Sequence, residues 1–273
     1  MNSNLVETAN LFRSLHDATR PLALSNAWDV ASALVTQAAG ASAIATTSAG
    51  VAWALGLPDG NRLSRVSAVE SIARIVAAVT VPVTADLEDG YADSPEELIV
   101  TVESVLEAGA VGINIEDGSR TPQDFAARIA ASRRTADLAG IPLFVNARTD
   151  VFLGGIGDPA NRLAETLARA SRYIDAGADG VFIPGIVDIE TIAALTSGVD
   201  APVNVMAGPG APNVRDLGRL GVSRVSLGSS VAQAAYAVAA QAAANLLSTG
   251  DYAALLGGMD YGKLNSLMAR SHA

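Results

Sequence analysis

The stretch Ala108-Gly109-Ala110-Val111-Gly112-Ile113-Asn114-Ile115-Glu116 contains the pattern that decides the fold. Its first glycine is suited to end a helix in the left-handed conformation. A short apolar run then follows as a buried strand, and an acid stands where that strand ends. Three other segments begin in the same way: Ala39-Gly40-Ala41, Ala176-Gly177-Ala178 and Leu220-Gly221-Val222. The pattern predicts a series of repeated strand–helix units.

Short apolar runs recur along the whole chain and predict eight strands. We expect them at Pro21–Ser25, Ala43–Thr47, Val83–Leu87, Gly112–Glu116, Leu143–Ala147, Gly180–Pro184, Val203–Met206 and Arg224–Leu227. Strands that alternate with helices pair in parallel through right-handed crossovers. Eight such units predict an α/β fold, a (β/α)8 TIM barrel with extra terminal helices. An open doubly wound sheet is the alternative.

A single domain accounts for residues 1–273, because no segment rich in Pro, Gly or Ser divides the chain. Residues 1–20 are expected to form a leading helix, and residues from about 230 to 273 terminal helices. The apolar stretch Val231–Leu247 is interrupted by polar residues, so we interpret it as a buried or subunit-contacting helix and not as a membrane span. Such helices bury better between subunits, which favours a homodimer or homotetramer.

The composition excludes several classes of function. A net charge of -10 repels nucleic acid and anionic membranes. The chain has no cysteine, which excludes disulfides, thiolate metal sites and a cysteine nucleophile. Its two histidines, His16 and His272, stand near the chain ends, which argues against a histidine zinc site or a catalytic triad. The absence of cysteine and of a signal peptide fits a cytoplasmic protein.

Acidic residues collect where the third and fourth expected strands end. Asp86 and Glu88 are two residues apart and point the same way on an extended strand, and Glu116 ends the neighbouring strand. Like charges about 4 Å apart repel by roughly 4 kcal/mol at an effective dielectric of 20, so this crowding favours a bound cation. Oxygen-only ligands indicate Mg²⁺ or Mn²⁺. Other acids at strand ends are interpreted as helix caps or loop charges: Asp29, Asp117 and Asp150.

Arg148 is the one base among these acids. It either forms an ion pair that neutralises Glu116 or Asp86, or binds a substrate carboxylate or charge that develops during reaction, and both roles are compatible. The segment Thr47-Ser48-Ala49-Gly50 ends the second expected strand. Its small residues let backbone N–H groups approach a carboxylate, although small residues also suit a tight turn.

Taken together, these segments resemble the isocitrate lyase / phosphoenolpyruvate mutase superfamily from the first expected strand to the eighth. The matching segments are Asn26-Ala27-Trp28-Asp29, Ala31-Ser32-Ala33, Thr47-Ser48-Ala49-Gly50, Leu55-Gly56-Leu57-Pro58-Asp59, Ala85-Asp86-Leu87-Glu88-Asp89-Gly90-Tyr91, Ile113-Asn114-Ile115-Glu116-Asp117 and Ala147-Arg148-Thr149-Asp150. Each motif is weak alone, and their order and spacing carry the resemblance.

The resemblance implies a role for each matching residue. Those expected around Mg²⁺ (or Mn²⁺) are Asp59, Asp86, Glu88 and Glu116. Those expected to bind substrate are Thr47, Ser48, Ala49, Gly50, Asp59, Arg148 and Asn204. The catalytic candidates are Arg148, Glu116 and Tyr91, although Tyr91 and Ser119 are also suited to purely structural hydrogen bonds. The resemblance also implies dimers or tetramers with exchanged terminal helices.

Departures from the superfamily narrow the expected reaction. Lyases of this superfamily carry a lid with a catalytic cysteine after the fourth strand, and this chain has none. A helix from Pro122, capped by Thr121 and ended by Gly140, fills that connection and leaves no room for a long lid. Glu88 replaces a more usual aspartate, and Ala49 a common glycine.

These departures disfavour cleavage of isocitrate or methylisocitrate. The expectation is a magnesium-dependent lyase or mutase that breaks a C–C or P–C bond of a small 2-oxo carboxylate, oxaloacetate-like or phosphonopyruvate-like, through a metal-stabilised enolate. An aldolase of pyruvate enolates and a non-catalytic 2-oxo-acid-binding protein are the alternatives.

Overall fold

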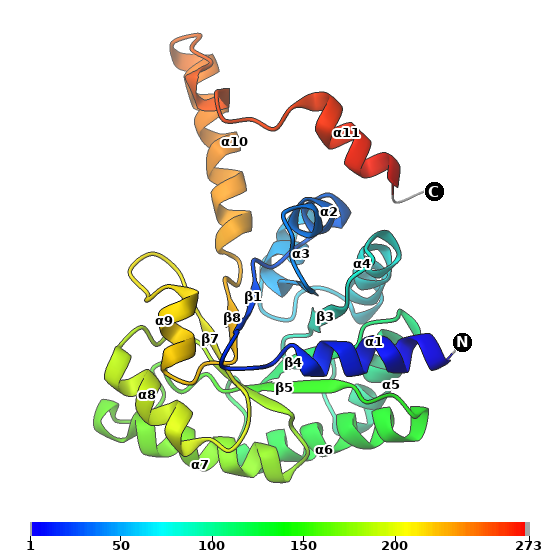
Figure 1. Cartoon of the computed structure of the whole chain (residues 1–273), viewed down its shortest axis with the longest axis vertical. Coiled ribbons are helices and arrows are strands. Elements are labelled where there is room, and N and C mark those ends of the chain that lie inside the picture. Colours follow the sequence, from blue (N-terminus) through cyan, green and yellow to red (C-terminus); the bar gives the residue numbers. More distant parts are fainter. Residues whose placement is uncertain (1, 271–273) are drawn as a thin grey trace.

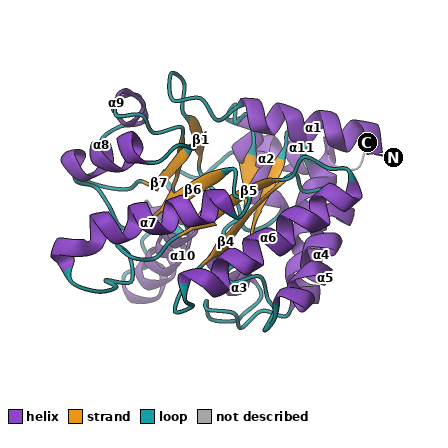
Figure 2. Cartoon of the chain, turned by 90° about the horizontal axis from the view of Figure 1, so that it is seen from below, coloured by secondary structure: helices purple, strands orange, loops and turns teal. Residues whose placement is uncertain are grey.

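The computed structural model describes residues 2–270 and shows eight parallel strands that form a barrel. The strands lie at the centre and helices surround them (Figures 1 and 2). The strands are β1 (Leu22–Leu24), β2 (Ile44–Ala45), β3 (Val83–Asp86), β4 (Gly112–Glu116), β5 (Phe144–Arg148), β6 (Gly180–Ile183), β7 (Val203–Met206) and β8 (Arg224–Ser226). They pair in the order β1-β8-β7-β6-β5-β4-β3-β2.

The two ends of this order, β1 and β2, meet beyond their last residues and close the barrel. A parallel bridge joins Ala27 to Thr46. The Ala27 N–H donates to the Ala45 carbonyl at 2.8 Å, and the Thr47 N–H donates to the Ala27 carbonyl at 3.0 Å. The closure excludes the open sheet and confirms the (β/α)8 barrel.

Asn26 holds this seam together and does so in a left-handed conformation, with φ of 59°. Its Nδ2 donates to the Thr46 carbonyl at 2.9 Å. Its Oδ1 accepts from the backbone N–H groups of Leu227, at 3.0 Å, and Gly228, at 3.1 Å. One buried side chain thus joins the ends of β1, β2 and β8, and asparagine is among the few residues other than glycine that tolerate this conformation.

Helices follow the strands and cover the outside of the barrel. They are α1 (Asn2–Ser14), α2 (Val30–Ala38), α3 (Ser48–Ala54), α4 (Arg65–Ala78), α5 (Pro95–Glu107), α6 (Pro122–Ala139), η1 (Pro159–Asn161), α7 (Arg162–Asp175), α8 (Ile189–Gly198), α9 (Val214–Arg219), α10 (Ser230–Ser248), η2 (Ala253–Leu255) and α11 (Tyr261–Arg270). An apolar core of mainly aliphatic side chains lies between strands and helices.

Local signals in the sequence position these elements. Asp29 caps α2, where its side chain accepts from the Ser32 N–H. Thr121 caps α6 and Pro122 begins it, while Gly140 ends it at a φ of 70°. The repeated helix-ending glycines also have positive φ, from 89° to 106°: Gly40, Gly109, Gly177 and Gly221. These four predictions from the repeat are confirmed.

The predicted boundaries differ modestly from the observed ones. β4 and β7 have the predicted bounds, and the other strands differ by one or two residues at an end. β2 is only two residues long, because Thr46 already belongs to the seam and Thr47 is the N-cap of α3. The leading helix ends at Ser14 and not at residue 20. His272 lies outside the described residues.

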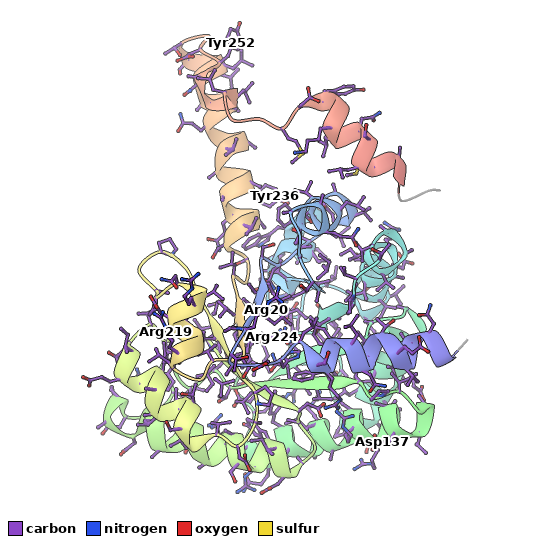
Figure 3. All side chains as sticks on the ribbon, in the orientation of Figure 1. Arg20, Asp137, Arg219, Arg224, Tyr236 and Tyr252 are labelled. Carbon is purple, nitrogen blue, oxygen red and sulfur yellow. The ribbon has the colours of Figure 1, made fainter. Side chains whose placement is uncertain are left out.

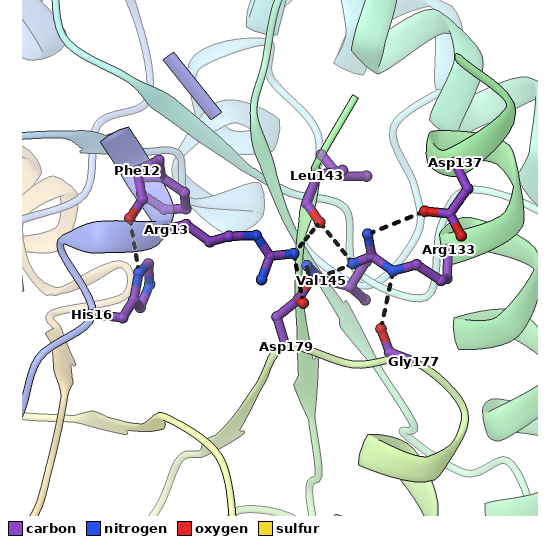
Figure 4. A network of polar contacts seen from close by, with 9 residues as sticks. All are labelled: Phe12, Arg13, His16, Arg133, Asp137, Leu143, Val145, Gly177 and Asp179. Atoms are coloured by element: carbon purple, nitrogen blue, oxygen red, sulfur yellow. Dashed lines mark hydrogen bonds and ion pairs between the residues drawn. The ribbon is translucent and has the colours of Figure 1, made fainter. Parts of the chain in front are cut away.

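The N-terminal end of the barrel is closed by α1 and a group of charged side chains (Figure 4). The carboxylate of Asp179 pairs with both Arg13, at 2.6 Å, and Arg133. Both arginines also donate to the Leu143 carbonyl. This network ties α1 and α6 to the N-terminal ends of the strands. In such barrels this end contributes to stability, and the active site lies at the other end.

The terminal helices leave the barrel. α10 projects away from it, with Tyr236 part-way along and Tyr252 beyond its end, and α11 turns back to contact α2 (Figures 1 and 3). Several large apolar side chains of this region are exposed, among them Leu247 at 85% and Leu256 at 88%. Among the helices formed by residues 2–270, none has the length and apolarity that crossing a membrane requires.

Candidate functional site

The expected acids lie at the C-terminal ends of adjacent strands. Asp86 is the last residue of β3, Glu116 of β4, and Arg148 of β5. Glu116 and Arg148 are register partners, and Asp86 is the register partner of Asn114, two residues before Glu116. Strand pairing therefore places these side chains at one end of the barrel, where active sites of this fold lie.

Arg148 is held between two acids. Its Nη1 lies 2.7 Å from Glu116 Oε2, and its Nε donates to Asp150 Oδ1 at 2.7 Å. Burial alone would lower the pKa of Arg148, but the charges of Glu116 and Asp150 outweigh it and raise that pKa. The guanidinium is fixed on two sides, and its side chain remains 19% exposed. This exposed part can contact a ligand at the barrel mouth. Because most of the side chain is already shielded from water, such a contact requires little further desolvation.

Asp86 is fixed by the start of α3. Its Oδ2 accepts from the Ser48 N–H at 2.9 Å and from Ser48 Oγ at 2.8 Å. Its own backbone N–H donates to Thr46 Oγ1 at 2.8 Å. The small-residue segment after β2 thus contacts the acid at the end of β3, which brings two of the predicted site motifs together.

The prediction that Asp86 and Glu88 share one extended strand is wrong, because β3 ends at Asp86. Glu88 and Tyr91 form a strained turn beyond β3. Both have positive φ, 53° for Glu88 and 50° for Tyr91, which is uncommon for side chains other than glycine, asparagine or aspartate. The Glu88 carboxylate accepts from the Asn61 N–H and, at 3.3 Å, from the Tyr91 hydroxyl. Asn61 also has positive φ, 58°. Strain of this kind is often found at ligand sites, where the surrounding contacts maintain it.

Negative charge exceeds positive charge at this end of the barrel. Burial raises the pKa of Glu116 to about 8; Arg148 opposes the shift, while Asp86 and Asp150 add to it. Burial also raises the pKa of Glu88, against the Asn61 hydrogen bond and with a contribution from Asp59. A cation would offset the cost of burying these carboxylates in their charged form and would reduce their mutual repulsion.

The donors present determine whether a divalent cation fits. Within residues 2–270, no three acidic or histidine side chains are arranged so that they could hold one ion together. Asp86, Glu88 and Glu116 nevertheless lie close enough for their charges to act on one another. Mg²⁺ takes oxygen ligands, keeps several waters and uses one or two carboxylates directly. The donors here therefore suit one or two direct contacts to a hydrated Mg²⁺ or Mn²⁺, and not the expected site in which several carboxylates bind the ion together.

The other predicted residues lie at different depths. Thr47 is the N-cap of α3 without a side-chain capping bond, and Ala49 and Gly50 form the first turn, where backbone N–H groups lack intrahelical acceptors. A side chain at Gly50 would lie 2.8 Å from both Thr47 and Trp28, so the close approach requires glycine. Asp59 is exposed in the loop after α3.

Asn204 lies below this layer, inside the barrel. It is 1% exposed, and its Oδ1 accepts from Asn146 Nδ2 at 3.1 Å while its Nδ2 donates to Ser226 Oγ at 3.2 Å. The predicted substrate contact from Asn204 would therefore have to come from a side chain that is already hydrogen-bonded to protein.

Sequence reasoning missed several residues that support the site. The sequence pattern favours a cap or loop charge at Asp150, but Asp150 lies just beyond the end of β5 and pairs with Arg148, the last residue of that strand. Asp117 is fully buried and accepts from Arg169 at 2.7 Å and from the Tyr173 hydroxyl at 2.7 Å. No local signal relates Asp117 to residues of α7, because they lie more than fifty positions along the chain.

A cavity of about 890 Å³ opens at the opposite end of the barrel, between α1, α4 and α5. Its walls include Val76, Val81 and Leu106. It contains none of the strand-end acids, so we place the candidate site at the other end, where Arg148 and the acids meet.

A family model described as phosphoenolpyruvate phosphomutase matches residues 12–247, which include every strand of the barrel. The chain belongs to the phosphoenolpyruvate phosphomutase family. An uncharacterised protein of Mycobacterium tuberculosis H37Rv is similar to this family member, at 41% identity over 88% of this chain and 90% of the relative.

Two solved structures from Burkholderia cenocepacia J2315 are also similar. One, of a candidate lyase/mutase, is 38% identical with a TM-score of 0.89 and covers 98% of each chain. The other, of a candidate phosphonomutase, is 43% identical with a TM-score of 0.82 and covers 90% of this chain and 100% of that one.

More distant family relatives have named activities. The 2-methylisocitrate lyase of Escherichia coli K12 is 28% identical over 70% of this chain and 67% of its own length. The oxaloacetate decarboxylase 2 of Pseudomonas putida W619 is 29% identical over 63% of this chain and 58% of its own length. The chain is accordingly an enzyme of the isocitrate lyase / phosphoenolpyruvate mutase superfamily, whose members here are lyases and phosphonomutases.

Proposed function

We propose that this enzyme breaks or rearranges the bond next to the 2-oxo group of a small 2-oxo carboxylate, oxaloacetate-like or phosphonopyruvate-like, with Mg²⁺ or Mn²⁺. One observation carries the proposal: Arg148 is fixed between Glu116 and Asp150 at the end of β5, beside acids whose charges repel one another. This arrangement suits an anionic ligand that also carries oxygen donors for a cation.

Each part of the site has a role in this proposal. Arg148 binds the substrate carboxylate and stabilises the negative charge that develops on the 2-oxo oxygen. The metal, held near Asp86 and Glu116, would supply Lewis-acid polarisation of that oxygen. The first-turn amides of Ala49 and Gly50 provide additional donors. Tyr91 lies beside Glu88 as a candidate proton carrier, although burial and that neighbouring charge raise its pKa and keep the hydroxyl protonated.

The short connection after β4 supports the choice of substrate class. Only residues 117–121 separate β4 from α6, and the chain contains no cysteine. A reaction that needs a protonating group on a lid, such as cleavage of a methylisocitrate-like acid, is poorly served by this connection. Decarboxylation or P–C chemistry makes a smaller demand on it.

A substrate panel tests the proposal. The purified enzyme, loaded with Mg²⁺ or Mn²⁺, is incubated with oxaloacetate, phosphonopyruvate, methylisocitrate and a 4-hydroxy-2-oxo acid, and products are identified by NMR. Metal-dependent turnover of one of the first two is expected. Cleavage of the 4-hydroxy-2-oxo acid would identify a pyruvate-enolate aldolase instead. Tight oxalate binding without any turnover would identify a binding protein.

A further inference from the structure

Arg224, the first residue of β8, is completely buried inside the barrel. Its Nη2 donates to Asn114 Oδ1 on β4 at 3.2 Å. Because β8 and β4 lie on opposite sides of an eight-stranded barrel, this hydrogen bond crosses the interior. Figure 3 shows Arg224 at the centre of the molecule. Val225 faces the other way and packs in the core outside the strands.

The guanidinium of Arg224 is poorly satisfied. Its Nε and Nη1 are buried and have no hydrogen-bond partner among the described residues. None of the ion pairs formed within residues 2–270 includes it. Arg128 is also buried, but it donates to the carbonyls of Asp89 and Ala92. Arg224 therefore carries a desolvation cost that other buried arginines of this chain largely avoid.

Folding stability does not explain an arginine at this position. Replacing a buried, incompletely paired charge with an apolar side chain of similar volume is often neutral or stabilising. Burial lowers the pKa of Arg224 to about 9, against the opposing charge of Asp86, so the side chain is positively charged near neutral pH. A buried charge with this cost points to a function, and Asp86 is the acid whose charge acts on Arg224.

The polar interior links Arg224 to the acids above it. Asn114 Oδ1 accepts from both Arg224 and, at 2.9 Å, Asn146 Nδ2. Asn114 is the register partner of Asp86 and lies two residues before Glu116, on the same side of β4. Arg224 thus sits directly beneath the layer that contains Asp86 and Glu116.

His16 lies near enough to Arg224 for the two side chains to interact electrostatically, but it does not balance the charge of Arg224. Burial, followed by the charge of Arg224, lowers the pKa of His16 to about 3, so the ring is neutral near pH 7. Its Nε2 also lacks a hydrogen-bond partner in the described part of the chain. The field of Arg224 is therefore opposed only from the side of the acids.

We propose that Arg224 is a positioning residue of the candidate site, which attracts an anionic substrate to the barrel mouth and fixes Asn114 beneath the acids. This inference rests on the proposed function. A buried positive charge below the site strengthens the binding of a dianion above it and weakens the binding of a divalent cation there, because both act through a weakly screened interior. The arginine accordingly sets the balance between metal and substrate affinity.

Two affinities test this inference without measuring turnover. Mn²⁺ binding to the metal-free enzyme is measured by electron paramagnetic resonance, and oxalate binding to the Mn²⁺-loaded enzyme by calorimetry. For Arg224→Met, we expect Mn²⁺ to bind about three-fold more tightly and oxalate about ten-fold more weakly than in the wild type. Arg224→Lys, which keeps the charge, should restore most of the oxalate affinity. The midpoint of urea unfolding should not fall in Arg224→Met.

Arg133→Met is the matched control, since Arg133 is a partly buried arginine in the network at the opposite end of the barrel (Figure 4). It should lower the unfolding midpoint and leave both affinities within about two-fold of the wild type. If Arg224→Met fails to fold, Arg224→Gln provides the same comparison. Unchanged Mn²⁺ and oxalate affinities in these variants would overturn the inference. A wild-type enzyme that binds neither probe would overturn the proposed function itself.

Discussion

Arg148 Nη1 lies 2.7 Å from Glu116 Oε2, across two strands on which these residues are register partners. The pairing register of β4 and β5 therefore fixes this ion pair, and no loop has to move to form it. Because a strand register holds Arg148 in place, its guanidinium is already oriented before any ligand arrives, which reduces the cost of ordering it on binding.

Replacing Arg148 should abolish most of the activity. Arg148→Met removes the proposed carboxylate partner and leaves Glu116 and Asp150 without their shared cation. We expect kcat/KM for the active 2-oxo acid to fall by about 100-fold or more. Steady-state kinetics with a saturating metal concentration would measure the loss. Arg148→Lys should recover only part of it, because an ammonium cannot contact both acids in the same planar geometry. Wild-type activity in Arg148→Met would contradict the assignment.

Replacing Asp86 should weaken metal binding more than replacing the serine that holds it. Asp86→Asn removes a proposed ligand charge, and we expect Mn²⁺ affinity to fall by about ten-fold or more. Ser48→Ala keeps the backbone donor to Asp86 Oδ2 and removes only the hydroxyl donor, so its effect should be smaller. Titration of both variants with Mn²⁺ gives the comparison. Equal losses of Mn²⁺ affinity in the two variants would contradict the role of the Asp86 charge as a metal ligand.

The buried pair between Asp117 and Arg169 should contribute strongly to stability. Arg169→Met leaves the fully buried Asp117 carboxylate without the positive charge that lies 2.7 Å from it, although the Tyr173 hydroxyl still donates to it. We expect the free energy of unfolding to fall by about 3–5 kcal/mol. Arg219→Met removes an exposed pair with Asp216 and should cost no more than about 1 kcal/mol. Urea unfolding of the two variants measures the difference, and similar losses would refute the argument from burial.

His16 should make stability depend on pH. Burial, then the charge of Arg224, lowers its pKa from 6.5 to about 3, and its ring stacks on Phe144 with centroids 3.9 Å apart. The imidazole of His16 takes up a proton near pH 6.5 in the unfolded chain but not in the folded protein. The folded state therefore has its full stability relative to the unfolded chain above pH 6.5 and loses part of it as the pH falls toward 3. When the pH is lowered from about 7 to about 5, the unfolding midpoint of His16→Gln should fall less than that of the wild type. Parallel losses would exclude this role.

The exposed terminal helices predict association between copies of the chain. Leu247 and Leu256 are 85% and 88% exposed in and beyond α10. We expect light scattering to show a dimer or tetramer, and Leu247→Glu with Leu256→Glu to reduce the measured mass. Leu138→Glu is the control, because Leu138 is a lone 91% exposed leucine on α6. A monomeric wild type would refute the expectation of a homo-oligomer.

Much of the fold could be predicted from local sequence, because its signals act over a few residues. The helix-ending glycines, the Asp29 and Thr121 caps and the short apolar runs each depend on neighbours within one turn or strand. Their repetition was enough to predict the closed barrel. The convergence of Asp86, Glu116 and Arg148 followed from the same reasoning, since each residue ends its strand. Their roles in metal and substrate binding stay predictions.

The remaining features depend on contacts across the barrel. The hydrogen bond from Arg224 to Asn114 joins residues 110 positions apart and depends on barrel closure and on the stagger of opposite strands. An arginine at the start of an apolar run also resembles an ordinary surface residue in the sequence. The partnership of Asp117 with Arg169 depends likewise on how α7 lies relative to the loop that follows β4. Neither relationship has a signature within a sequence window.

The seam between β1 and β2 has a consequence for the whole cylinder. Seven strand contacts are ladders of paired residues, whereas the eighth consists of one bridge and the amide of Asn26. The barrel is therefore held closed between β1 and β2 by one short contact, which lies next to Thr47 and Ser48. A ligand bound to Thr47 and Ser48 would stabilise this short contact between β1 and β2. Ligand binding and closure of the barrel are therefore thermodynamically linked.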